Sequence, residues 1–120
     1  MRSSFGRKQN NTMLIGRFYF KITPSGNLIG EYSNRSSSSL GSFAEAATRI
    51  SEGNGWIGDY QSTWCEAPNF AVASARLKIT QVNADIFIVK WYDSAEPNPK
   101  TLFDGEAMVC DGMLIGDYTG

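Results

Sequence analysis

A five-residue pattern occurs three times along the chain: an apolar residue, isoleucine, glycine, an acid and tyrosine. The copies begin at Leu28, Trp56 and Leu114, and each follows a turn that contains glycine. In an extended strand, the first residue, the glycine and the tyrosine share one face, and the isoleucine and the acid share the other. The pattern predicts short strands of matching design. We expect glycine on the inner face to permit strand coiling, with the tyrosine covering the space it leaves.

Two-residue alternation continues between the copies, so strands are the first interpretation for most of the chain. Turn residues separate the alternating segments, as at Pro24-Ser25-Gly26 and Asp111-Gly112. The predicted strands are 12–23, 27–33, 56–65, 71–82, 85–92, 102–110 and 113–118.

The segment 42–52 supports two interpretations. Ser42 and Glu45 have the spacing of a helix capping box, and the apolar residues from Phe43 to Ile50 fall at helical intervals. The glycine-rich turn that follows suits a hairpin instead. An antiparallel meander closes without a parallel seam only when the number of strands is even, so closure favours an eighth strand here. The expected fold is all-β, an antiparallel up-and-down β-barrel of about eight strands. Seven strands plus a short helix at 43–51 is the alternative.

Length and composition are those of one globular domain, with 120 residues of which 42% are apolar and 19% charged. Residues 1–11 contain basic residues but no apolar stretch, so we expect a flexible polar leader followed by a single barrel domain at 12–120. No apolar run approaches the roughly 18 residues that suggest a membrane span. The net charge of −1 gives no reason to bind nucleic acid or an anionic membrane. We therefore expect a cytoplasmic protein.

The chain contains no histidine. Its absence removes histidine-activated nucleophiles, imidazole bases and histidine-ligated metals. Cys65 and Cys110 are too few for a zinc site, and they fall on strands that are not neighbours in a meander, so we expect free thiols. No catalytic motif is recognisable. We expect a non-catalytic protein without cofactor or metal, and an enzyme is the third alternative.

Three segments resemble the avidin and lipocalin-like calycin barrels. Residues 18–32 contain an apolar strand, a glycine turn and a Leu-x-Gly-x-Tyr strand, which is similar to the first avidin hairpin. The segment 56–60 looks like a later strand of that family, and 87–91, followed by a long loop and 103–105, resembles its C-terminal half. The resemblance implies a small antiparallel barrel with Tyr32 pointing inward. The biotin-binding positions of avidins cannot be matched one by one, so biotin is not implied.

The inner face of the predicted barrel carries the candidate ligand site. Tyrosine and tryptophan have polar tips that need partners when buried, so their grouping inside a barrel predicts a cup with apolar and polar walls. A barrel of eight strands is just wide enough either to hold one small ligand or to be filled by side chains. The candidate ligand-binding residues are Tyr32, Trp56, Tyr60, Ser62, Trp64, Trp91 and Tyr118.

The outer face carries isoleucines and acids, namely Glu31, Asp59, Asp104, Glu106 and Asp117. We expect these acids to pair with basic residues on neighbouring strands, and the same parity predicts no clustered carboxylates inside the barrel. Several exposed isoleucines on one side suggest a surface that a partner covers. The leading hypothesis is a binder of a small, partly apolar ligand inside the barrel. The alternative is a structural or interaction module with a filled barrel, which docks a partner or homo-oligomerises, as a dimer, through its outer apolar face.

Overall fold

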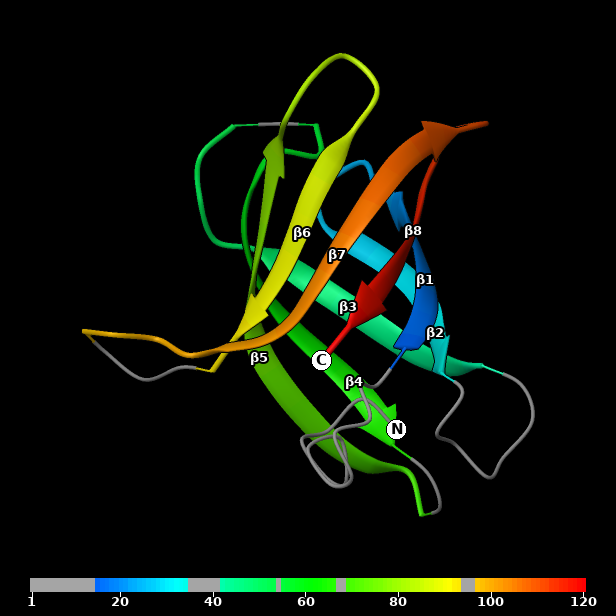
Figure 1. Ribbon diagram of the computed structural model, residues 1–120, viewed down its shortest axis with the longest axis vertical. Helices are drawn as coiled ribbons and strands as arrows, with labels where there is room; N and C mark the ends of the chain where they lie inside the picture. The colour runs from blue at the N-terminus through cyan, green and yellow to red at the C-terminus, as the bar shows by residue number, and fades with distance from the viewer. Residues whose placement is uncertain (1–14, 35–41, 54, 67–68, 94–96) are drawn as a thin grey trace.

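The computed structural model describes residues 15–34, 42–53, 55–66, 69–93 and 97–120. These residues form eight strands in chain order, each antiparallel to the next, and β1 also pairs with β8 so that the barrel closes (Figure 1). The strands are β1 (Ile15–Ile22), β2 (Leu28–Asn34), β3 (Phe43–Arg49), β4 (Gly58–Glu66), β5 (Ala71–Gln81), β6 (Phe87–Tyr92), β7 (Thr101–Cys110) and β8 (Met113–Thr119).

The predicted all-β, eight-stranded antiparallel barrel is confirmed. This is the coarse architecture that the calycin resemblance implied, while a relationship to avidins stays a prediction. The expected leader at 1–11 lies outside the described residues. Within the described part of the chain, no helix is long and apolar enough to cross a membrane.

β3 decides between the two interpretations of the segment 42–52, and the helical alternative is wrong. The strand pairs with β2 on one side and β4 on the other. The stripe that suggested a helix is divided between two faces, since Ala47 is buried in the core and Ala46 is exposed. Local helix signals lose here because a helix would leave the facing edges of β2 and β4 without backbone partners.

The three copies of the repeated pattern take the predicted faces. Their isoleucines are exposed, and the inward positions of the copies are buried at Leu28, Tyr32, Tyr60, Leu114 and Tyr118. A Cβ atom at Gly30 or Gly116 would collide with a carbonyl oxygen of the adjacent strand. Tyr118 covers a glycine of a neighbouring strand and not the one in its own copy: its ring lies over Gly16 of β1, and its hydroxyl donates to the Ser33 carbonyl at 3.2 Å.

The meander gives the barrel two unlike ends. The β1–β2, β3–β4, β5–β6 and β7–β8 connections lie at one end, at the top of Figure 1, which we call the hairpin end. The C-terminus lies at the opposite end, which we call the terminal end. Aliphatic side chains such as Leu28, Ile79 and Leu114 fill the hairpin half. The polar-tipped aromatic residues Tyr32, Trp64 and Tyr118 lie in the terminal half.

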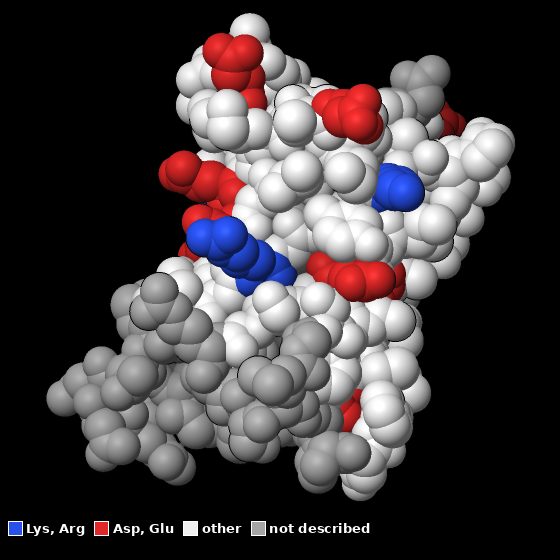
Figure 2. All heavy atoms as spheres, turned by 90° about the vertical axis from the view of Figure 1, so that its right-hand side faces the viewer, with Lys and Arg blue, Asp and Glu red and all other residues white. Residues whose placement is uncertain are grey.

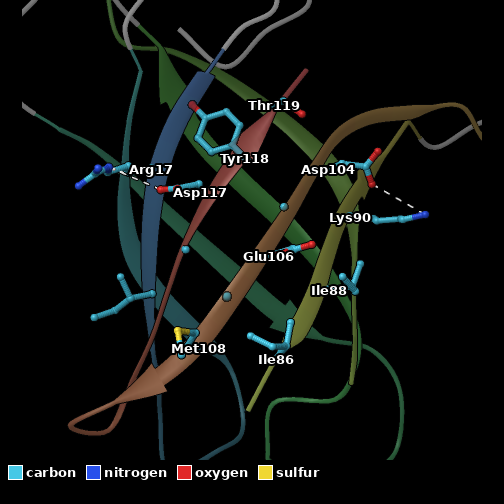
Figure 3. A pocket seen from close by; sticks show the side chains of 14 residues that line it. Arg17, Ile86, Ile88, Lys90, Asp104, Glu106, Met108, Asp117, Tyr118 and Thr119 are labelled. Atoms are coloured by element: carbon cyan, nitrogen blue, oxygen red, sulfur yellow. Dashed lines mark ion pairs between the residues drawn. The ribbon is translucent and has the colours of Figure 1, made fainter. Parts of the chain in front are cut away.

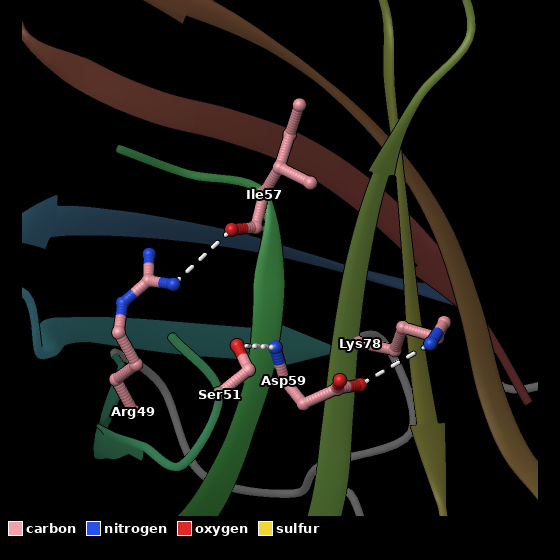
Figure 4. A network of polar contacts seen from close by, with 5 residues as sticks. All are labelled: Arg49, Ser51, Ile57, Asp59 and Lys78. Atoms are coloured by element: carbon pink, nitrogen blue, oxygen red, sulfur yellow. Dashed lines mark hydrogen bonds and ion pairs between the residues drawn. The ribbon is translucent and has the colours of Figure 1, made fainter. Parts of the chain in front are cut away.

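Arg49, the last residue of β3, fastens the hairpin end. Its backbone N–H donates to Asn27 Oδ1 at 2.9 Å, and its Nε donates to the Gly26 carbonyl at 3.3 Å. Its guanidinium also donates to the Ile57 carbonyl at 3.2 Å (Figure 4) and to the Gly55 carbonyl. One side chain therefore ties the β1–β2 turn to the β3–β4 connection.

The same guanidinium contacts Tyr60 on the inner face of β4. It lies 4.9 Å from the ring centroid and donates to the Tyr60 hydroxyl at 2.8 Å. Burial raises the pKa of this hydroxyl, and Arg49 opposes the effect while Asp59 adds to it. Beside it, Ser51 Oγ accepts from the Asp59 backbone N–H at 2.9 Å, and Asp59 pairs with Lys78 at 3.3 Å (Figure 4).

Replacement of Gly116 by alanine should lower the free energy of unfolding by about 3 kcal/mol, because the added methyl group would force β7 and β8 apart. Gly112 provides a matched control, since it has a φ of +78° but open space around it. Gly112→Ala should lose only about 1 kcal/mol, from the backbone conformation alone. Urea denaturation of both variants tests the difference, and an equal or larger loss at Gly112 would contradict the close approach of the strands.

Candidate functional site

The seven predicted site residues lie in the barrel interior, but the structure divides them between its two halves. Six are 0–3% exposed, and Trp56 is half-buried and packs against the core. Tyr60 and Trp56 lie near the hairpin end, where the Tyr60 hydroxyl donates to the Trp56 carbonyl at 2.8 Å. The other polar-tipped aromatic residues lie in the terminal half. Whether any of them binds a ligand stays a prediction.

Aromatic rings pack against one another across the terminal half. Trp91 meets Phe18 edge to face at 5.3 Å between ring centroids, and it meets Phe103 in the same way at 6.4 Å. Tyr118 lies 5.8 Å from both Trp91 and Phe103, and Trp64 lies 6.3 Å from Phe103. Edge-to-face pairs of this kind stabilise a core beyond their area burial. The rings therefore pack against one another where the sequence predicted the walls of a cup.

Phe18 and Phe103 belong to this cluster but were not among the predicted site residues. Both are buried phenylalanines without a polar tip, whereas the site was predicted from tyrosine and tryptophan. Tyr32 packs against Phe43, at 5.8 Å between ring centroids, and its hydroxyl donates to the Cys65 carbonyl.

Two carboxyl groups also lie inside the barrel, whereas the sequence placed the acids it singled out on the outer face. Glu45 is 3% exposed, and its Oε2 accepts from Ser62 Oγ at 2.6 Å and from Trp91 Nε1 at 2.9 Å. Glu66 is 7% exposed and accepts from Trp64 Nε1 at 2.9 Å.

The alternation of inward and outward residues along a strand accounts for both buried acids. Once 43–49 is a strand, Glu45 alternates inward between Phe43 and Ala47. Glu66 extends the inner face of β4 by one position beyond Trp64. Both inward positions are readable from the sequence. A helix at 43–51 would not place Glu45 on an inner face, and the predicted strand 56–65 ends one residue before Glu66.

The network at Glu45 joins three strands across the interior, because Glu45 lies on β3, Ser62 on β4 and Trp91 on β6. A buried carboxyl group without partners would cost several kcal/mol, and hydrogen bonds from a hydroxyl and an indole offset that cost. The acid therefore links β6 to β3 and β4, which pair with each other but not with β6. No group of three potential metal ligands was found among the described residues.

The outer wall is hollowed across β6, β7, β8 and β1, forming a groove of about 910 Å³ (Figure 3). Its apolar floor consists of Ile86, Ile88, Met108 and Ile115. The ion pair between Arg17 and Asp117, at 3.5 Å, borders one side. The pair between Lys90 and Asp104, at 3.8 Å, borders the other, with Glu106 between the two.

Three of the five outer acids pair as the sequence predicted. Asp59, Asp104 and Asp117 each pair with a base on a neighbouring strand, whereas the ion pairs among the described residues include neither Glu31 nor Glu106. Pairs this exposed contribute at most about 1 kcal/mol each, so they determine surface charge more than stability. Figure 2 shows acids and bases scattered over one side of the barrel, with uncharged surface between them.

Replacement of Glu45 by alanine should lower the free energy of unfolding by about 3 kcal/mol, because the Ser62 hydroxyl and Trp91 indole would lose a shared acceptor in the interior. Glu45→Gln should cost less, since its amide oxygen can still accept. Glu52 is exposed in the β3–β4 connection, and its alanine variant should change stability by under about 0.5 kcal/mol. Chemical denaturation measures all three, and an unchanged Glu45→Ala variant would contradict the network.

No protein-family model matches the sequence, and comparisons with curated proteins and with solved structures give no significant match. The function must therefore be inferred from the chemistry of the surfaces and the interior described above.

Proposed function

We propose that this protein is a non-catalytic interaction module, a filled barrel that docks a peptide segment of a partner protein in the groove on its outer wall. The observation that carries the proposal is the contrast between the two faces of the sheet. The interior is occupied by its own side chains, and the outer wall is hollow and apolar.

The packing of the interior supports this assignment. Tyr60, Ser62 and Trp91 have no exposed surface, and the rings of the terminal half touch one another. A ligand inside would have to displace these side chains and break the hydrogen bonds at Glu45. A partner on the outer wall displaces only water.

The lining of the groove indicates the chemistry of the partner. Aliphatic side chains with partly exposed surfaces favour an apolar segment, since burial of apolar area stabilises association. Glu106 lies among them, between the two bordering ion pairs, and favours a lysine or arginine on that segment. A second hollow of about 410 Å³ shares Arg17 and Ile115 with the groove and extends the surface over β1 and β2.

We place this module in the cytoplasm. Cys65 and Cys110 are both free thiols, as the sequence predicted, and free thiols suit a reducing compartment.

A small-molecule binder remains the second candidate function, and the buried acids favour it. An apolar residue in place of Glu45 could make a core of equal or greater stability, and departures from apolar packing concentrate at functional sites. The ligand would be small and partly apolar, with a hydrogen-bond donor for Glu45 or Glu66. This function requires the rings of the terminal half to move apart when the ligand enters.

Short random peptides displayed on phage and selected on the wild-type protein test the groove. The selected peptides should combine apolar residues with lysine or arginine. They should bind the Glu106→Gln variant about tenfold more weakly, because a hydrogen bond to a charged group is worth about 1.5–3 kcal/mol. Fluorescence polarisation measures the affinities.

Glu52→Gln serves as the control, since it removes an exposed carboxylate far from the groove and should leave affinity unchanged. Peptides without basic residues, or peptides that bind both variants as tightly as the wild type, would refute docking in the groove.

A further inference from the structure

The β4–β5 hairpin is longer than the strand beside it. β5 pairs with β4 from its first residue, Ala71, but it pairs with β6 only from Arg76 onward. Among the described residues, the segment Ala71–Ala75 therefore has a strand partner on one side only. Figure 1 shows this hairpin projecting past β6 at the terminal end. We call Asn69–Ala75 the β5 arm.

The tip of the arm holds an aromatic ring in solvent. Phe70 has a φ of +60° and is 68% exposed. A bulky residue in the left-handed region costs roughly 1–2 kcal/mol, and the Asx turn from Asn69 Oδ1 to the Ala71 N–H, at 3.3 Å, supports it. Val72, two residues further along, is 70% exposed. Packing within the barrel accounts for neither exposed side chain. Backbone strain such as that at Phe70 is typical of functional sites.

We infer that the edge of the β5 arm pairs with the same edge of a second copy of this chain, joining two barrels in an antiparallel seam. A row of backbone donors and acceptors on a strand edge specifies another β-strand as its occupant. Two identical strand edges related by a twofold axis pair antiparallel. Each contact that one copy makes with the other is then repeated by symmetry. The seam would also bring the exposed side chains of Phe70 and Val72 against the partner arm.

The composition of the arm favours a second copy over other strands. Residues 69–75 carry no charge, so two identical arms do not repel each other. Exposed edges in monomeric proteins are commonly protected by lysine, proline or an inward charge, and Ala71–Ala75 contains none of these. The edge is thus suited to self-pairing.

This association goes beyond the groove and does not depend on it. β6 lies beside both surfaces, but its groove residues Ile88 and Lys90 precede its last residue, Tyr92, whereas the unpaired edge of β5 runs past that residue, so the seam and the groove use different parts of the wall. The dimer would present two grooves, which would strengthen binding to a partner with two matching segments.

Sedimentation velocity over a range of protein concentrations tests the seam with a matched pair of variants. Val72→Lys places a charge on the edge, and Val82→Lys makes the same change at a valine that is 62% exposed at the hairpin end. The wild type and Val82→Lys should show the same monomer–dimer equilibrium. Val72→Lys should dimerise at least about tenfold more weakly, because an edge lysine opposes strand pairing.

A wild-type protein that stays monomeric at every concentration would overturn the inference, as would equal dimerisation of the two variants. Hydrogen exchange of the wild type keeps the test valid if Val72→Lys does not fold. The amides of Ala71–Ala75 that face away from β4 should gain protection as concentration rises, and protection independent of concentration overturns the seam. Peptide binding in the groove should be the same in Val72→Lys, so failure of the seam and failure of the groove are separate results.

Discussion

Pairing of β1 with β8 is the constraint on which the rest of the structure depends. It joins the two ends of the meander along Ile15–Lys21 and Met113–Thr119 and encloses the interior. In a barrel of eight strands that space is only wide enough for side chains or one small ligand, so each inward residue must fit its neighbours. Glycine at Gly30 and Gly116 lets strands approach, the rings meet edge to face, and Glu45 lies within hydrogen-bonding distance of Ser62 and Trp91.

Closure also determines where binding surfaces can occur. A closed sheet offers no free edge around the barrel, and its inner face is occupied. What remains is the outer wall, where small inward residues such as Gly105 and Gly116 lie beneath the groove, and the β5 arm, where one strand runs past its neighbour. The two surfaces lie on different parts of the wall. One barrel could therefore use the arm for its own copy and the groove for a partner.

Much of this fold is readable from two-residue alternation, which predicted seven strands, their faces and the turn at Asp111-Gly112. The eighth strand required the additional argument of closure, because the local signals at 43–49 favoured a helix as strongly. Glu45 was missed for the same reason, since only the strand interpretation turns it inward. The groove and the β5 arm depend on register and strand curvature, which arise from pairing between distant segments and leave no local signal.

The central claim is that the barrel's own side chains fill its interior, and hydrogen exchange of the tryptophan indoles measured by NMR tests it most directly. Trp64 and Trp91 donate their indole N–H groups to Glu66 and Glu45, while Trp56 is half-buried and serves as an internal reference. A filled interior predicts that the indole protons of Trp64 and Trp91 exchange only when the whole barrel unfolds. Exchange of either proton as fast as that of Trp56 would mean that water enters the interior, and would favour a ligand cup over a filled core.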